Sequence, residues 1–304
     1  MMKTQARESD KLKDKIIFSC LVLLTTALMG SSFVVAKIGL IYISPLLLAG
    51  IRFTIAGSIM AAFVVIFKRK HPKDAKTWRN IVLIGAIQTA GVMGSIFLSL
   101  RTITSGQSAI LTFMNPLLVV LIGTLLLGMH YRLIQWIGVF LGFAGVFVTM
   151  GSELELEIGT LLGFMSAIFW AGGTLLIKKW GVTIDMWVLT AYQMLFGGVI
   201  LLTSSLFLEN TYLMINSTSV FILFWLSIPA SIVQFTIWFY LLQKGDSGKV
   251  SAFLFLAPFF GILSGWLVLG EPLGYALLLG GSLIFTGIFL VNWPEKRLPV
   301  KATI

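Results

Sequence analysis

Long apolar runs, separated by short polar segments, follow one another along the whole chain. A helix needs about 20 consecutive apolar residues to cross the hydrocarbon core of a bilayer, and most of these runs reach that length. The pattern therefore predicts ten transmembrane helices. They cover residues 16–37, 45–67, 80–100, 105–127, 133–150, 158–178, 186–208, 219–242, 249–270 and 273–293.

The composition agrees with this pattern. Of the 304 residues, 58% are hydrophobic and 11% are charged, and the mean hydropathy is +0.98. A soluble domain carries about 25% charged residues, so this chain could not cover its own surface in water. The first apolar run exceeds the ~7–15-residue core of a signal peptide and lacks a cleavage site of small residues. We expect it to be retained and the chain to be an all-α polytopic membrane protein.

Basic residues predict how the chain lies in the membrane, because cytoplasmic loops carry an excess of Lys and Arg. With a cytoplasmic N-terminus, 19 of the 22 Lys and Arg lie on the cytoplasmic side, many of them in the tails 1–15 and 294–304. The acidic stretch "SELELE", residues 152–157, then lies outside. Both termini are predicted to be cytoplasmic. Because loops and tails hold the net charge of +10, nucleic acid is not an expected partner.

The second half of the chain repeats the first, at an offset of 141 or 142 residues. The matched pairs are Lys37 and Lys178, Gly57 and Gly198, Ser105-Gly106 and Ser247-Gly248, Pro116 and Pro258, Leu127-Gly128 and Leu269-Gly270, Gly138 and Gly280, and Gly145 and Gly287. We therefore divide the chain into two five-helix repeats, residues 16–150 and 158–293. Because five is odd, the second repeat enters the membrane from the opposite side. Inverted repeats of this kind are typical of alternating-access transporters.

These features together resemble a known family. They include "NP" at Asn115-Pro116, "AP" at Ala257-Pro258 and "LGE" ending at Glu271, besides Gly-rich fifth and tenth spans. Over residues 16–293 the chain resembles the EamA-type drug/metabolite transporter superfamily. The resemblance implies a carrier of the bacterial inner membrane, in many members an exporter of amino acids or related metabolites. It also implies a central cavity built mainly from the first four helices of each repeat.

Polar residues within the predicted spans are candidates for substrate contacts. Arg52 lies seven residues into the second span, about 10 Å deep, so it either attracts a substrate carboxylate or extends toward the headgroups. The neutral candidates are Gln88, Ser95, Asn115, Trp170, Tyr192, Gln193, Gln234 and Trp238. They either line a moderately polar pocket or hydrogen-bond neighbouring helices, at about 0.6 kcal/mol per bond.

Two prolines and one glutamate are candidates for gating and coupling. Pro116 and Pro258 each remove a backbone donor, which predicts either a helix break at a gate or a static kink. Glu271 is a possible coupling residue, although the first repeat has Met129 at the equivalent position. The glycine sets around Gly138, Gly159 and Gly261 predict close helix packing within the chain or between two chains.

Several kinds of chemistry lack their motifs. The sequence has no Walker-type phosphate loop, and its two histidines, His71 and His130, lie in or near predicted cytoplasmic loops, so we expect no catalytic, metal or cofactor site. We therefore expect a secondary transporter that exports amino acids or related metabolites, with the lipid bilayer and a small-molecule substrate as its partners. The alternatives are a carrier of nucleotide sugars or phosphorylated metabolites, an intramembrane enzyme and a sensor. The sequence leaves a monomer or a homodimer open.

Overall fold

The computed structural model describes residues 2–128, 130–149, 157–244, 256–291 and 293. Within them the backbone is helical, apart from turns, loops and one isolated bridge between Ile43 and Leu213. Seven helical stretches are long and apolar enough to cross a membrane, and three shorter apolar helices, Leu133–Gly145, Leu256–Leu269 and Tyr275–Val291, accompany them. The chain is therefore an all-helical membrane protein, while the count of ten spans and the side on which the termini lie stay predictions.

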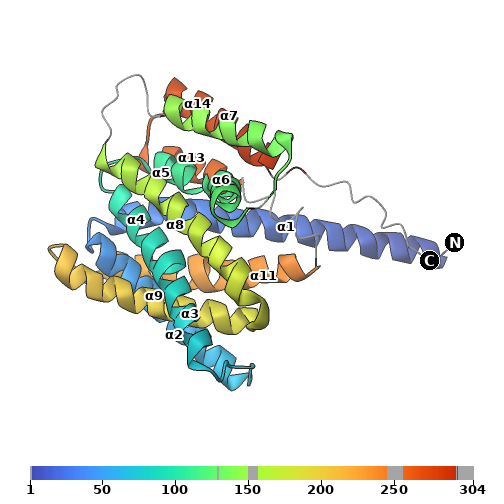
Figure 1. Cartoon of the computed structure of the whole chain (residues 1–304), viewed down its shortest axis with the longest axis horizontal. Helices are drawn as coiled ribbons and strands as arrows, with labels where there is room; N and C mark the ends of the chain where they lie inside the picture. The colour runs from blue at the N-terminus through green and yellow to red at the C-terminus, as the bar shows by residue number, and fades with distance from the viewer. Residues whose placement is uncertain (1, 129, 150–156, 245–255, 292, 294–304) are drawn as a thin grey trace.

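Figure 1 shows the arrangement of the helices, which cover the apolar runs, with α1 beginning before the first run. They are α1 Met2–Gly39, α2 Pro45–Ile66, α3 Ala75–Ile84, α4 Val92–Ser99, α5 Ser105–Thr112, α6 Asn115–Leu127, α7 Leu133–Thr149, α8 Ile158–Trp180, α9 Met186–Leu208, α10 Ser217–Ser227, α11 Gln234–Lys244, α13 Leu256–Leu269 and α14 Tyr275–Val291, with the π-helical turns η1 Gly85–Gly91 and η3 Ile228–Val233 and the 3-10 turn η2 Gly181–Thr183. Polar residues begin several of them: Asp74 accepts from the backbone N–H of Thr77, and Asp185 from that of Trp187. Such caps satisfy N–H groups that have no partner inside a helix.

Three of the predicted spans are not uniform helices. The third consists of α3, η1 and α4, and the eighth of α10, η3 and α11. The π-helical turns occur at equivalent positions of the two repeats, and such turns are frequent at functional sites. The fourth span is broken between Thr112 and Asn115, directly before Pro116.

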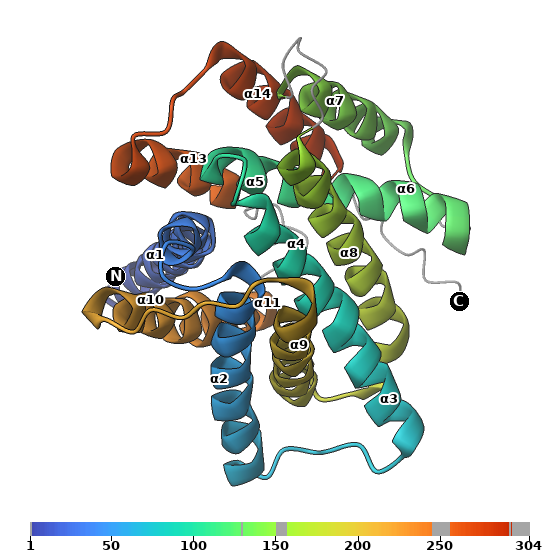
Figure 2. The same cartoon turned by 90° about the vertical axis from the view of Figure 1, so that its left-hand side faces the viewer.

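The repeat is visible in the backbone and in the packing. Gly128 and Gly270, which are 142 residues apart, both end a helix with positive φ, 60° and 65°, a conformation that favours glycine. Equivalent helices also pack against each other: Gly138 on α7 meets Gly287 on α14, whereas Gly145 meets Gly280. The two helices therefore run antiparallel, as an inverted repeat requires. Figures 1 and 2 show this pair at one edge of the bundle.

The glycine contacts decide between the two packing roles that the sequence left open for them. A Cβ added to Gly138 would lie 2.6 Å from the Gly287 carbonyl oxygen, and one added to Gly159 would lie 2.1 Å from Thr102 Oγ1. A Cβ at Gly261 would lie 2.8 Å from Ala109 Cβ. All three glycines thus let helices of the same chain approach closely.

Contacts between connections, hydrogen bonds at one end and an ion pair at the other, define two ends of the bundle. At the first end, the connection from α1 to α2 pairs with the connection from α9 to α10, through the Ser44 N–H to the Tyr212 carbonyl at 3.1 Å and the Met214 N–H to the Tyr42 carbonyl at 2.8 Å. At the second end, the connection from α2 to α3 meets the connection from α8 to α9, where Arg69 pairs with Asp185 at 3.7 Å.

Candidate functional site

A cavity of about 360 Å³ lies between the two repeats. Its wall comes from α1, α2, η1 and α4 of the first repeat and from α8, α9 and α11 of the second. The lining residues are Met29, Arg52, Phe53, Gln88, Thr89, Val92, Met93, Trp170, Thr174, Ile177, Met186, Leu189, Thr190, Gln193, Met194, Gln234, Phe235 and Trp238. The volume falls in the range of small-molecule sites, about 300–1,000 Å³.

Arg52 brings a buried positive charge to this wall. Its residue is 5% exposed, which rules out an extended side chain in the headgroup region. The guanidinium Nε donates to Ser231 Oγ at 3.0 Å, and Nη2 donates to the Ala230 carbonyl at 2.9 Å. The guanidinium also lies 4.7 Å from the centroid of the Phe53 ring. These contacts fix α2 against η3 and hold the charge at the cavity.

Three glutamines contribute uncharged polar groups. Gln193 Oε1 accepts from Thr89 Oγ1 at 3.0 Å, between α9 and η1. Gln234 Nε2 and Gln88 Oε1 are buried and have no hydrogen-bond partner in the described part of the chain. Buried polar groups are almost always hydrogen-bonded. The two atoms therefore mark places in the wall where a ligand or water would complete the bonding.

The structure gathers some of the predicted residues and not others. Arg52, Gln88, Trp170, Gln193, Gln234 and Trp238 line one cavity. Ser95 and Asn115 are buried elsewhere, in α4 and at the start of α6. Tyr192 lies beside the wall, with its hydroxyl 3.2 Å from His71 Nε2 and its ring against Trp78.

Both prolines lie outside the cavity wall. Pro116 is the second residue of α6, after the break in the fourth span. Pro258 is buried as the third residue of α13. The residues directly before α13 are outside the described part of the chain, so the fourth span alone displays the predicted break.

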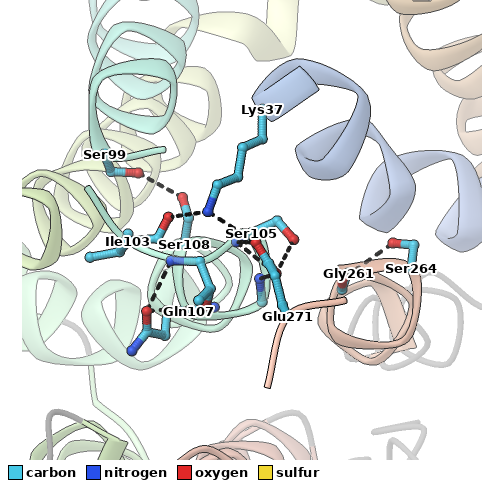
Figure 3. A network of polar contacts seen from close by, with 11 residues as sticks. Lys37, Ser99, Ile103, Ser105, Gln107, Ser108, Gly261, Ser264 and Glu271 are labelled. Carbon is cyan, nitrogen blue, oxygen red and sulfur yellow. Dashed lines mark hydrogen bonds and ion pairs between the residues drawn. The ribbon is translucent and has the colours of Figure 1, made fainter. Parts of the chain in front are cut away.

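Glu271 joins two helices and the segment after α13 at the first end (Figure 3). Its carboxylate accepts from Lys37 Nζ at 3.0 Å, from Ser105 N at 2.8 Å and from Ser105 Oγ at 2.6 Å. Gly106 N adds a contact of 3.4 Å, and Lys37 Nζ also donates to the Ile103 carbonyl at 2.9 Å. We call Lys37, Ser105, Gly106 and Glu271 the Glu271 latch. It joins the end of α1, the start of α5 and the segment after α13.

The surroundings of the latch favour a charged carboxylate. Burial by itself would raise the pKa of Glu271, but the hydrogen bonds from Ser105 and Lys37 together lower this pKa below its ordinary value. A negative charge is also favourable at the N-terminus of α5, where backbone N–H groups have no partner within the helix. The latch therefore works as an ionic contact at neutral pH, and it lies apart from the cavity.

A second glutamate closes the same end. Glu209, which follows α9, accepts from the N–H groups of Leu46 and Leu47 at 3.2 and 3.0 Å, and from Ser205 Oγ at 2.7 Å. It thereby caps the start of α2. This pairing has no signal in the sequence, because an isolated glutamate in a polar connection is common and its partners on α2 are more than 160 residues away.

The cavity extends from the middle of the helices toward the second end. Its wall reaches Ile177, near the end of α8, and Met186, the first residue of α9. Met186 is 44% exposed. In contrast, none of the described first-end connections, where the two glutamates are bonded, contributes a residue to the wall. The cavity therefore lies nearer the second end than the first.

Comparisons with known proteins agree with this architecture. The model of the EamA-like transporter family matches twice, over residues 16–151 and 157–293. An uncharacterized transporter of Bacillus subtilis (strain 168), YvbV, is 34% identical over 282 residues, which cover 88% of either chain. The uncharacterized inner membrane transporter YedA of Escherichia coli (strain K12) is 26% identical over 279 residues, 90% of either chain.

More distant proteins share the fold. A chloroplastic WAT1-related protein of Arabidopsis thaliana is 25% identical over 279 residues, covering 88% of this chain and 67% of the relative. A solved crystal structure superposes with a TM-score of 0.65 at 19% identity, over 90% of this chain and 96% of the other.

In the described part of the chain, no group of three or more His, Cys, Asp or Glu is placed to hold a metal ion.

Proposed function

Because the chain belongs to the EamA-like transporter family, and is thus a small-molecule transporter of a membrane, we propose that it is a secondary carrier of amino acids or related metabolites that works by alternating access. The observation that supports this most is the cavity between the two repeats, with one end of the bundle held by the Glu271 latch and by Glu209. In inverted-repeat carriers, substrate sites lie near the bilayer midplane at the repeat interface. The repeats of the proposal are residues 16–150 and 158–293.

The chemistry of the wall supports a small substrate that carries one negative group. Among the described residues that line the cavity, Arg52 is the sole basic one. Nucleotide sugars and phosphorylated metabolites carry two or more negative charges and would need further cationic partners. We therefore favour amino acids and related compounds over these larger anions.

The proposed location is the bacterial inner membrane, with both termini in the cytoplasm. Such an orientation places the second end, with its basic connection 67–74, on the cytoplasmic side, in agreement with the excess of Lys and Arg in cytoplasmic loops. The cavity then extends toward the cytoplasm. A carrier in this state is ready to take up a cytoplasmic solute, which is the first step of export.

Counterflow in proteoliposomes tests the proposal. Vesicles that contain the purified protein and a pool of unlabelled amino acids receive one labelled compound at a time. Transient accumulation above that of protein-free vesicles is expected for at least one amino acid. If a working control carrier accumulates its substrate and this protein accumulates no amino acid and no related carboxylic acid, the proposed substrate class is wrong.

A further inference from the structure

The guanidinium of Arg52 has N–H donors that no described residue uses. A guanidinium carries five N–H groups, and two of those on Arg52 are used by Ser231 and Ala230. The other three have no acceptor among the described residues. Because Arg52 lines the cavity, these N–H groups are available to bond a ligand there.

Among the described residues, the charge of Arg52 also lacks a counter-ion. The described residues that line the cavity include no Asp or Glu, and the ion pairs Lys37 with Glu271 and Arg69 with Asp185 lie at the two ends of the bundle. A buried charge without a counter-ion is unfavourable. A negatively charged ligand would remove that cost.

A second unused donor lines the same cavity. Gln234 begins α11, three residues after Ser231, which accepts from Arg52. Gln234 is 3% exposed and its Nε2 is buried without a partner among the described residues. Because both residues line the cavity, α2 and α11 each offer N–H groups to a ligand bound there.

The remaining cavity wall fits a ligand whose other part is uncharged. Besides the polar residues, it consists of Met, Phe, Trp, Val, Ile and Leu side chains, among them Trp170 and Trp238. A substrate ammonium would meet no carboxylate here. It would meet Gln88 Oε1, an acceptor that a hydroxyl or a neutral amide can satisfy equally well.

We propose that the cavity recognises a monocarboxylate with an uncharged, mainly apolar body, whose carboxylate binds Arg52 and Gln234 and whose α-amino group is dispensable. This deepens, and rests on, the proposed carrier function of the same cavity. Deaminated relatives of apolar amino acids are then expected to bind about as well as the amino acids themselves. Compounds that carry a cation and no carboxylate are excluded, because Arg52 repels them.

Ligand-induced stabilisation of the purified protein tests this without transport. Matched sets differ by one group: leucine, 4-methylpentanoate and 3-methylbutylamine, and phenylalanine, 3-phenylpropionate and 2-phenylethylamine. In at least one set, the amino acid and its deaminated acid are both expected to raise the melting temperature, at half-maximal concentrations within about threefold of each other. The amine is expected to have no effect. Stabilisation by the amines, by the amino acids alone, or by none of the six compounds would overturn the proposal.

Variants assign the effect to the residues. Arg52→Gln is expected to weaken binding of the stabilising acid by at least about tenfold, since bonds to a charged group are worth about 1.5–3 kcal/mol. Arg101→Gln is the matched control, because Arg101 is exposed and outside the cavity. Gln234→Leu leaves Arg52 in place and is expected to weaken binding severalfold with little change in the melting temperature without ligand. Unchanged binding in Gln234→Leu and Arg52→Gln would refute the assignment.

The two proposals fail in different ways. Binding that follows the carboxylate rule, combined with absent counterflow, would disprove the carrier and leave the recognition rule intact. Counterflow of amino acids that requires the amino group would keep the carrier and refute the rule. A fall in the melting temperature of Arg52→Gln without ligand measures the contact between α2 and η3, separately from the ligand effect.

Discussion

Neutralising Glu271 should open the first end of the bundle. Glu271→Gln keeps the size of the side chain and one carbonyl oxygen, which can still accept from Ser105 N. It removes the charge that attracts Lys37 Nζ at 3.0 Å and that faces the start of α5. The closed end loses its ionic contact while its packing remains.

The size of the effect follows from three contacts. Hydrogen bonds to a charged group contribute about 1.5–3 kcal/mol, a charge near a helix N-terminus adds about 0.3–1 kcal/mol, and a partly exposed ion pair adds about 0–1 kcal/mol. These terms overlap, and glutamine keeps part of the bonding. We expect a net loss of about 1–3 kcal/mol, which raises the population open at this end by about 5- to 150-fold.

Thiol labelling measures that population. Cys20 is the single cysteine of the chain and is exposed, so the reporters are placed in a Cys20→Ser background. Ser108, which lies one turn after Ser105 and is fully buried, becomes the reporter as Ser108→Cys. A membrane-impermeant thiol reagent should label it 5- to 150-fold faster when Glu271 is replaced by Gln.

Two controls separate local opening from unfolding. Val188→Cys, buried in α9 near the second end, reports general unfolding and should be labelled at an unchanged rate. Glu157→Gln removes an exposed carboxylate that makes no side-chain capping bond at the start of α8. Equal labelling of Ser108→Cys in Glu271→Gln and Glu157→Gln would refute the role of the latch.

Three further predictions concern pH, packing and cycling. Because the pKa of folded Glu271 is lowered, the contribution of the latch is present above the ordinary value of about 4.3 and is lost as the pH falls through the folded pKa. The difference in melting temperature between the wild type and Glu271→Gln should thus be constant from pH 8 to about pH 5 and shrink below about pH 4. Gly138→Ala should destabilise the protein by about 1–3 kcal/mol, because its Cβ would lie 2.6 Å from the Gly287 carbonyl oxygen. Gly274→Ala is the control, since its Cβ would meet no atom within 4 Å. Equal melting temperatures of the two variants would contradict this. Pro258→Ala should slow counterflow and leave ligand stabilisation nearly unchanged, and unchanged turnover would remove support for a gating role.

Local and periodic features could be predicted from the sequence. The apolar runs predicted the helices, and the break before Pro116 follows from a residue that cannot continue a helix hydrogen-bond ladder. The matching glycines predicted the repeat, and Gly128 and Gly270 share an unusual backbone conformation. Each of these depends on a residue and its near neighbours, or on a fixed offset along the chain.

Contacts that depend on the relative rotation of helices could not be predicted. The depth of Arg52 fitted both an inward and an outward direction, and the choice is made by Ser231 and Ala230, which are more than 170 residues away. Glu271 and Lys37 were recognised separately, but their 3.0 Å contact spans 234 residues. The π-helical turns also lack a sequence signal, although Pro229 lies within η3.

A mismatch at Glu271 bears on which state the transporter prefers. Lys37 and Ser105-Gly106 of the latch have sequence equivalents in Lys178 and Ser247-Gly248, but Glu271 is matched by Met129. A fully symmetric pair of gates would close equally well, so neither end would be favoured at rest. The second end has the Arg69–Asp185 ion pair instead, which is longer, at 3.7 Å, and more exposed than the 3.0 Å pair of the latch. Exposed ion pairs contribute little, so closure of the first end is expected to have the larger ionic gain, roughly 1–3 kcal/mol. We therefore expect the resting carrier to be closed at the Glu271 end, and substrate binding to be needed mainly to open that end.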